Sequence, residues 1–283
     1  MFALTPGQPV QIAEGVWRLL ALNPGMMSGP GTNTYLIRYL DGLLVLDPGP
    51  EDPRHIINIE VAAQQLSLPV KKILVTHTHR DHSPAAHALH AQTGAPLCGP
   101  GAIDDNLQDE RWHPHEQLAD GDKIELGHST LKVISTPGHV GNHLCYLLES
   151  EGMLFSGDHL INGSTVVIAP PSGSMSAYLK SLEKLLPLDI HAIAPGHGDL
   201  IHQPKQAIEQ TISHRLKREH KVRTALSERP NSSASELVKI VYDDTPVFLH
   251  PIAEFSLLAH LIKLCEDGAA VVENSRYTLI EAA

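Results

Sequence analysis

A histidine-rich loop directly follows a short apolar strand, and it constrains the fold more than any other feature of this 283-residue chain. The run KKILVT at 71–76 is typical of a buried strand, and it continues as His77-Thr78-His79-Arg80-Asp81-His82. Alternate residues of an extended loop point the same way, so His77 and His79 can bind one ion. Asp81 and His82 follow at the turn into a helix, for which Ser83 is the expected cap, and can bind a second ion. The spacing predicts a metal site at a strand end.

Three later segments have the same arrangement. The predicted strands LKVIST, MLF and HAIA run into PGH, SGD and PGHG, which carry His139, Asp158 and His197. Each of these residues stands beside a glycine, which permits a tight turn. Because strand ends at one sheet edge lie close in space, the loops can converge. Five histidines and two aspartates suit zinc first, with manganese or iron as alternatives.

Composition narrows the class of protein. The chain has 19 His against 21 Lys plus Arg, and His is the commonest metal ligand. Its three cysteines form no C-x-x-C pair, which indicates neither a disulfide framework nor a thiolate zinc site. The net charge of −11 disfavours a surface that binds nucleic acid or anionic membrane throughout. No secretory signal is evident and no stretch approaches the length of a membrane span, so we expect a cytoplasmic protein without a membrane partner.

The pattern changes after about residue 203. Before it, short strands alternate with helices, which indicates an α/β fold. After it come a long helix at 205–226, a Ser-capped helix at 231–242, an apolar helix at 251–268 and a hairpin at 269–283. This order is that of a small winged-helix-like module. We therefore predict a catalytic domain at 1–203 and a winged-helix-like domain at 204–283.

A basic stripe marks the start of the second domain. Residues 205–223 contain six basic and two acidic residues, a local charge of +4. The stripe could bind RNA phosphates or an acidic acyl conjugate, with an ordinary solvated helix face as the alternative. Helix 251–266 has one Lys and two Glu, which argues against sequence-specific DNA recognition. We expect this domain to cover the active site or to mediate a homodimer.

Four residues are candidate substrate contacts: Asn33, His214, Arg215 and Arg218. Asn33 lies in the TNTY segment, which is equally compatible with the start of a strand. The acid that protonates the leaving group is not identifiable, and His143, His159 and His214 are candidates by residue type alone.

The motifs resemble the metallo-β-lactamase superfamily, whose H-x-H-x-D-H pattern is met at 77–82 and whose later ligands match in order. The resemblance implies an αβ/βα sandwich with the site at one sheet edge. It implies one metal held by His77, His79 and His139, a second held by Asp81, His82 and His197, and Asp158 bridging both. It also implies that Asp47 supports the metal loops.

A narrower resemblance covers nearly the whole chain. NPGMMSGPGTNTYLI, FSGDHL, APGHGDLIH and ISHRLKRE are similar to the branch typified by β-lactamase-like protein 2. That branch carries a C-terminal winged-helix-like domain, and its animal members are described as endoribonucleases on single-stranded RNA. Related branches are thioesterases, and others use one iron to oxidise persulfides. One departure is Pro84-Ala85, where the superfamily usually has Gly-Gly.

The resemblance implies a dinuclear zinc hydrolase. A hydroxide shared by the two metals would attack a carbonyl carbon or a phosphorus. Asp81 and Asp158 would anchor and orient the metals and so serve catalysis. Cleavage of single-stranded RNA and hydrolysis of a thioester or ester are close alternatives, and persulfide oxidation by iron is a third.

Overall fold

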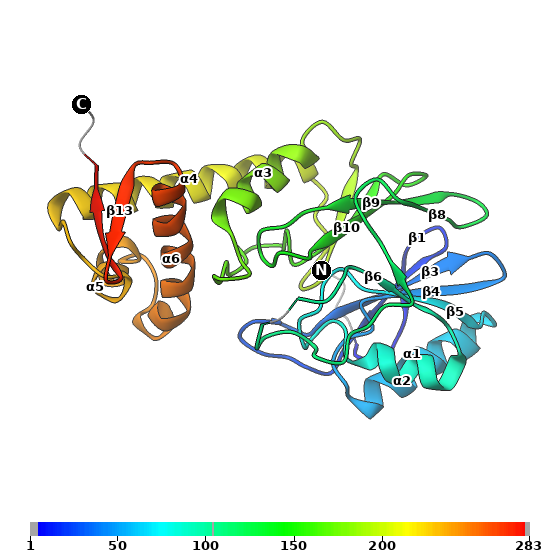
Figure 1. Ribbon diagram of the computed structural model, residues 1–283. Helices are drawn as coiled ribbons and strands as arrows, with labels where there is room; N and C mark the ends of the chain where they lie inside the picture. The colour runs from blue at the N-terminus through cyan, green and yellow to red at the C-terminus, as the bar shows by residue number, and fades with distance from the viewer. Residues whose placement is uncertain (1–4, 104, 281–283) are drawn as a thin grey trace. The chain divides into compact units, whose positions relative to one another are not determined.

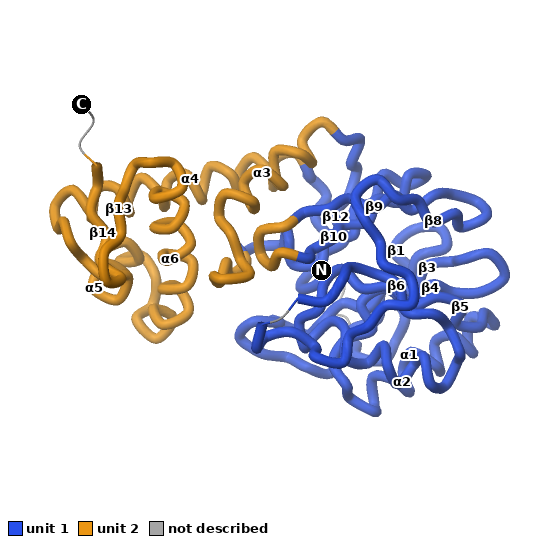
Figure 2. Tube along the Cα trace, in the orientation of Figure 1, with its two compact units in different colours: residues 1–136, 142–165, 188–204 blue, residues 137–141, 166–187, 205–283 orange. Residues whose placement is uncertain are grey.

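The computed structural model describes residues 5–103 and 105–280, which form two compact units (Figure 2). Unit 1 comprises residues 1–136, 142–165 and 188–204, and unit 2 comprises 137–141, 166–187 and 205–283. The last division falls within one residue of the predicted domain boundary, but two short segments before it also belong to unit 2. Residues 281–283 of the predicted hairpin lie outside the described residues.

Unit 1 contains a seven-stranded sheet in sequential order (Figure 1). Its strands are β1 (Val10–Ala13), β2 (Val16–Leu20), β3 (Asn33–Tyr39), β4 (Gly42–Leu46), β5 (Val70–Leu74), β6 (Leu97–Gly99) and β7 (Glu116–Gln117). The first four pair antiparallel, and β4 to β7 pair parallel. Helices α1 (Pro53–Leu66) and α2 (Ala85–Thr93) connect successive parallel strands, as parallel pairing requires.

A second, five-stranded sheet has the order β12-β11-β10-β9-β8. Its strands are β8 (Lys123–Glu125), β9 (Thr130–Ser135), β10 (Leu144–Leu148), β11 (Met153–Gly157) and β12 (Ala192–Pro195). All neighbours pair antiparallel except β11 and β12. The β11–β12 pair brings the ends of two predicted ligand-bearing strands to one edge.

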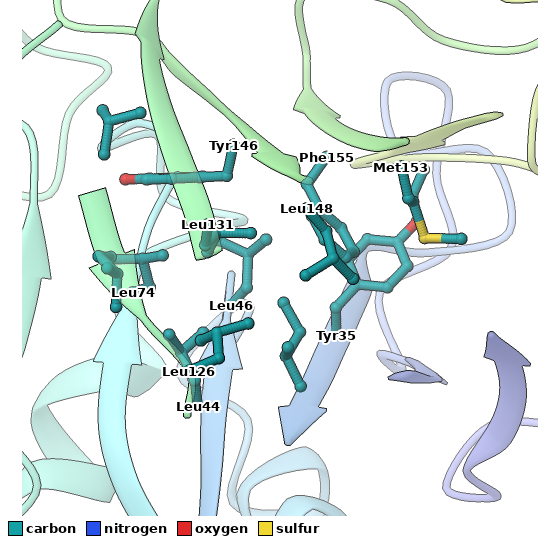
Figure 3. Close-up of a cluster of buried hydrophobic side chains, with 14 of the residues drawn as sticks. Tyr35, Leu44, Leu46, Leu74, Leu126, Leu131, Tyr146, Leu148, Met153 and Phe155 are labelled. Atoms are coloured by element: carbon teal, nitrogen blue, oxygen red, sulfur yellow. The ribbon is translucent and has the colours of Figure 1, made fainter. Parts of the chain in front are cut away.

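The core of unit 1 lies on both faces of the first sheet. Tyr35 and Leu46 from this sheet pack with Leu131, Tyr146 and Phe155 from the second (Figure 3). The alternate residues of the same strands pack against apolar side chains of α1 and α2. The continuous apolar run GLLVL in β4 fits this burial on two faces. The α/β class is thus confirmed.

Unit 2 contains the predicted order of helix, helix, helix and hairpin. Its elements are α3 (Met175–Leu185), α4 (Pro204–Glu228, from its second residue), α5 (Ala234–Val241), the 3₁₀ turn η1 (Val247–Leu249), α6 (His250–Glu266), β13 (Ala270–Glu273) and β14 (Arg276–Leu279). Ser233 and Glu236 form a capping box at the start of α5. Leucines of α5 and α6 pack with Val222, Leu226 and Tyr277 in the core of the unit.

One segment corrects the expectation about membrane spans. Val247–Glu266 is long and apolar enough, by length and composition, to cross a membrane. Its Leu257, Leu261 and Leu264 are buried in the hydrophobic core of unit 2. The core helix of a globular unit has these same properties, so the segment is weak evidence for a membrane.

Candidate metal centre

The metal loop, residues 77–83, follows β5 and is fixed by the buried side chain of Asp47. One carboxylate oxygen of Asp47 accepts a hydrogen bond from the Thr76 amide at 2.7 Å. The other accepts from the Thr76 hydroxyl at 2.8 Å and lies 3.0 Å from His82 Nδ1. Holding Nδ1 leaves His82 Nε2 available to a metal. The contacts agree with the supporting role that the resemblance implies for Asp47.

Within unit 1, the ligand atoms form two overlapping groups. His77, His82 and Asp158 form one group, and Asp81, His82 and His197 form the other; within each, the ligand atoms lie within 4.8 Å of one another. Asp158 Oδ1 lies 3.5 Å from His82 Nε2 and 3.4 Å from His197 Nε2. These two groups share His82, and together they contain five of the seven predicted ligands.

Of the two remaining predicted ligands, His79 also belongs to this centre within unit 1, and His139 lies in a segment of unit 2. His79 Nδ1 lies 2.9 Å from His77 Nε2, and the two rings meet edge to face. His139 lies in the 137–141 segment that belongs to unit 2, and its Nδ1 is 2.7 Å from the Val167 carbonyl. A bond from Nδ1–H to that carbonyl places the lone pair on Nε2, the tautomer that a metal ligand needs.

Two glycines allow the loops to approach the centre. A Cβ at Gly157, where φ is +46°, would lie 2.5 Å from Thr76 Oγ1 and 2.8 Å from His143 Nε2. A Cβ at Gly196 would lie 2.7 Å from Asp158 Oδ1. All three distances are shorter than real Cβ contacts, so the residues before Asp158 and His197 must lack side chains.

Asn33 positions the His197 loop and is not placed to meet substrate. The residue is fully buried, and its amide group donates to the carbonyls of Pro195 at 2.9 Å and Gly198 at 2.8 Å. Its backbone N–H donates to the Gly196 carbonyl at 2.7 Å. β3 begins at Asn33, so the strand-start alternative describes it, and its proposed contact with substrate finds no support.

The pKa values of the histidine ligands are shifted in opposite directions. Burial, with neighbouring histidines, holds the pKa of His77 well below its usual range. Burial also opposes charge on His82 and His197, but nearby carboxylates outweigh it, raising the pKa of His82 well above its usual value and that of His197 to about 10. Despite burial, these imidazoles lower the pKa of Asp81 to about 2.

The residues present fit a pair of divalent ions. The donors are imidazole nitrogens and carboxylate oxygens, which suit zinc, manganese or iron. Asp81 is ionised at neutral pH, and a bound cation would displace the protons of His82 and His197. The arrangement therefore provides the ligand set of a dinuclear centre.

Two of the three substrate contacts predicted in unit 2, Arg215 and Arg218, are buried and contact other parts of the unit. Arg215 is buried, donates to the Val166 carbonyl and lies 5.3 Å from the centre of the Tyr178 ring. Arg218 is buried, donates to Asp244 at 2.9 Å and lies 4.2 Å from the Tyr242 ring centre. Both guanidinium groups thus have partners within unit 2. His214 is exposed on α4, and its role stays a prediction.

Sequence reasoning named His143 by residue type alone, as a candidate acid, and missed Gln108 and Asp109 beside the metal loop. His143 stacks on His77 with ring centres 5.1 Å apart, and its Nε2 accepts a hydrogen bond from the Asp158 amide at 3.2 Å. It therefore orients ligands, which disfavours it as the leaving-group acid. Gln108 and Asp109 contact the loop from a segment with no recognisable motif. Neither residue directly follows a predicted strand as the ligands do, so no local sequence signal could have identified them.

Comparison with known proteins identifies related sequences for both parts of the chain. The family model of the metallo-beta-lactamase superfamily matches residues 28–197, and that of the beta-lactamase associated winged helix domain matches residues 233–277. The beta-lactamase-like protein 2 homolog of Drosophila melanogaster is 33% identical over 94% of this chain and 92% of its own length. The thioesterase pkgB of Emericella nidulans is 30% identical over 79% of this chain and 62% of its own length.

The fold is also shared with solved structures. The beta-lactamase domain protein from Burkholderia ambifaria has a TM-score of 0.82 and 23% identity, covering 99% of this chain and 96% of that chain. Together with the matches to both domains and the convergent His and Asp groups, these similarities lead to one assignment. The chain belongs to the metallo-β-lactamase superfamily, as a metal-dependent hydrolase that carries the associated winged-helix domain.

Proposed function

We propose that this protein hydrolyses acyl thioesters or related esters at a centre that holds two zinc ions. The observation that carries the proposal is the pair of overlapping ligand groups that share His82. His77, His79 and His139 would hold one ion, and Asp81, His82 and His197 the other. Asp158, which lies within 3.5 Å of two imidazoles, would serve both.

The chain's own residues prepare this centre. Two bound zinc ions would supply an activated water and polarise the attacked carbonyl. His77 stays neutral and keeps its lone pair, since burial depresses its pKa. Asp81 provides negative charge at neutral pH, and Asp47 fixes the tautomer of His82. Asp81 and Asp158 would thus anchor and orient the metal ions.

The contacts of the basic stripe argue against an extended RNA-binding surface. Arg215 and Arg218 are buried, and Lys221 pairs with Asp243 at 2.7 Å and Asp244 at 3.1 Å. Three of the six basic residues counted in the sequence are thereby engaged inside unit 2, which weakens a phosphate-binding surface. The thioesterase pkgB, named for thioester chemistry, is a relative over most of this chain.

Metal content and a substrate panel test the proposal. Purified protein should contain two zinc ions per chain by mass spectrometry. It should hydrolyse an acyl-glutathione or an acyl-coenzyme A faster than a lactone, a chromogenic lactam or single-stranded RNA. Cleavage of RNA without thioester hydrolysis would overturn the substrate class. One iron per chain without zinc would overturn the dinuclear centre and favour persulfide oxidation.

A further inference from the structure

We infer that Asp109 is a positioning residue for the metal loop and holds it at residues that Asp47 does not reach. The inference rests on the proposed metal centre. Asp109 belongs to the segment 105–112, which follows β6 and carries no predicted ligand. The carboxylate nevertheless lies against the loop that carries four of them.

Asp109 is a buried carboxylate whose two oxygens accept three hydrogen bonds. Its Oδ2 accepts hydrogen bonds from Ser83 Oγ at 3.1 Å and from His87 Nε2–H at 3.1 Å. Its Oδ1 accepts from the Arg111 amide at 3.1 Å. A charge can be buried only where such partners replace water. Asp109 therefore joins the end of the metal loop, helix α2 and its own segment at one point.

Ser83 explains why this contact bears on the ligands. The residue directly follows His82, and its position before Pro84 predicted that it would cap α2. That expectation is wrong, because the structure has Pro84 at the N-cap position and Ser83 Oγ donates to Asp109. The hydroxyl fixes the backbone next to a ligand rather than the start of a helix.

Gln108 extends the same contact to the middle of the loop. The Thr78 hydroxyl donates to Gln108 Oε1 at 2.5 Å, and the Asp109 amide donates to the Thr78 carbonyl at 2.7 Å. His79 and Gln108 also form an antiparallel bridge. Because Thr78 stands between two predicted ligands, fixing it fixes the direction of both neighbouring imidazoles.

Asp47 and Asp109 hold the loop at several points. The Asp47 carboxylate binds Thr76 and His82, whereas the Asp109 carboxylate binds Ser83 and the Asp109 backbone amide binds the Thr78 carbonyl. A loop ordered before the ion arrives loses less conformational entropy on binding. Groups that orient ligands in this way typically change metal affinity by about 10- to 100-fold when they are removed.

The test compares Asp109→Asn with Asp189→Asn, a carboxylate that is 93% exposed and lies outside the metal loop. Both variants lose one negative charge, but only the first alters a contact with the loop. Asp109→Asn should weaken zinc binding by about 10- to 100-fold in a chelator competition and shift the visible spectrum of the cobalt-substituted protein. Asp189→Asn should leave both unchanged. Thermal unfolding without metal is measured alongside, since a merely structural loss would lower stability without altering the cobalt spectrum.

Ser83→Ala removes one donor and keeps the result decisive if Asp109→Asn fails to fold. It should weaken zinc binding in the same direction and by less. Folded variants at Asp109 and Ser83 with wild-type zinc affinity and cobalt spectrum would overturn the inference alone. A wild-type protein that binds no zinc or cobalt would overturn the proposed centre, and the positioning role with it.

Discussion

Both units bury charged side chains, but they use them differently. In unit 1, buried imidazoles and carboxylates face one another, as in the 3.3 Å approach of His197 Nε2 to Asp81 Oδ2. In unit 2, the buried cations end on carbonyls, ring faces and a carboxylate, as Arg218 does. Donor atoms that converge on a common point provide a place for an added ion. Charges with their own partners hold the fold together.

A second cluster in unit 2 follows the same rule. Lys263 Nζ lies 3.2 Å from Glu219 Oε1, and His260 Nδ1 lies 3.6 Å from Glu219 Oε2. This cluster joins α4 to α6, and its cation and carboxylate neutralise each other. It resembles a site by composition, whereas its contacts are those of a helix interface.

The largest expected effect comes from Asp158→Ala in unit 1. The side chain contacts ligands of both groups, so its loss should lower the metal content below two ions per chain. We expect kcat to fall by about 10³-fold, because a metal contributes several kcal/mol to transition-state stabilisation and each 1.36 kcal/mol is tenfold. Asp189→Ala, at a carboxylate that is 93% exposed, is the matched control. Wild-type turnover by Asp158→Ala would contradict the proposed role.

Arg218→Ala should have the opposite profile. It removes hydrogen bonds to the Val241 carbonyl and to Asp244 and a contact with the Tyr242 ring. We expect the free energy of unfolding to fall by about 2 kcal/mol, as for lost hydrogen bonds to a charged group. Hydrolysis per folded molecule should stay at the wild-type level. Denaturant titration and kinetics on the same preparation measure both, and a loss of turnover without a loss of stability would break the comparison.

The smallest expected effect is on acid stability. A hydrogen bond from Arg218, with one from Lys221, lowers the pKa of Asp244 from 3.8 to about 2. The folded state thus favours the ionised form, so this stabilisation is present above about pH 4 and is lost as pH falls through about 2. It should amount to less than about 1 kcal/mol, because the carboxylate is 51% exposed and solvent screens the pair. The difference in unfolding free energy between wild type and Asp244→Asn should shrink across this range; a constant difference would exclude the linkage.

The sequence predicted the helices of unit 2 and the strand ends of unit 1 well, because hydrophobic periodicity and turn residues are local signals. The prediction failed where a residue type is compatible with two different roles. Ser83 has the residue type of a helix cap but donates to Asp109, which lies 26 positions away. Asn33 has the residue type of a substrate contact but donates to Pro195, which lies 162 positions away.

The sequence alone determined the ligand types and their order, since metal binding needs particular donor atoms at spacings that a strand and its loop set locally. It also determined that a second, helical domain follows. Only the tertiary structure decided which polar residues are free. Burial and hydrogen-bond partners come from segments far apart in the chain, and these assigned Arg215 and Arg218 to the fold and Asn33, Gln108 and Asp109 to the support of the metal loops.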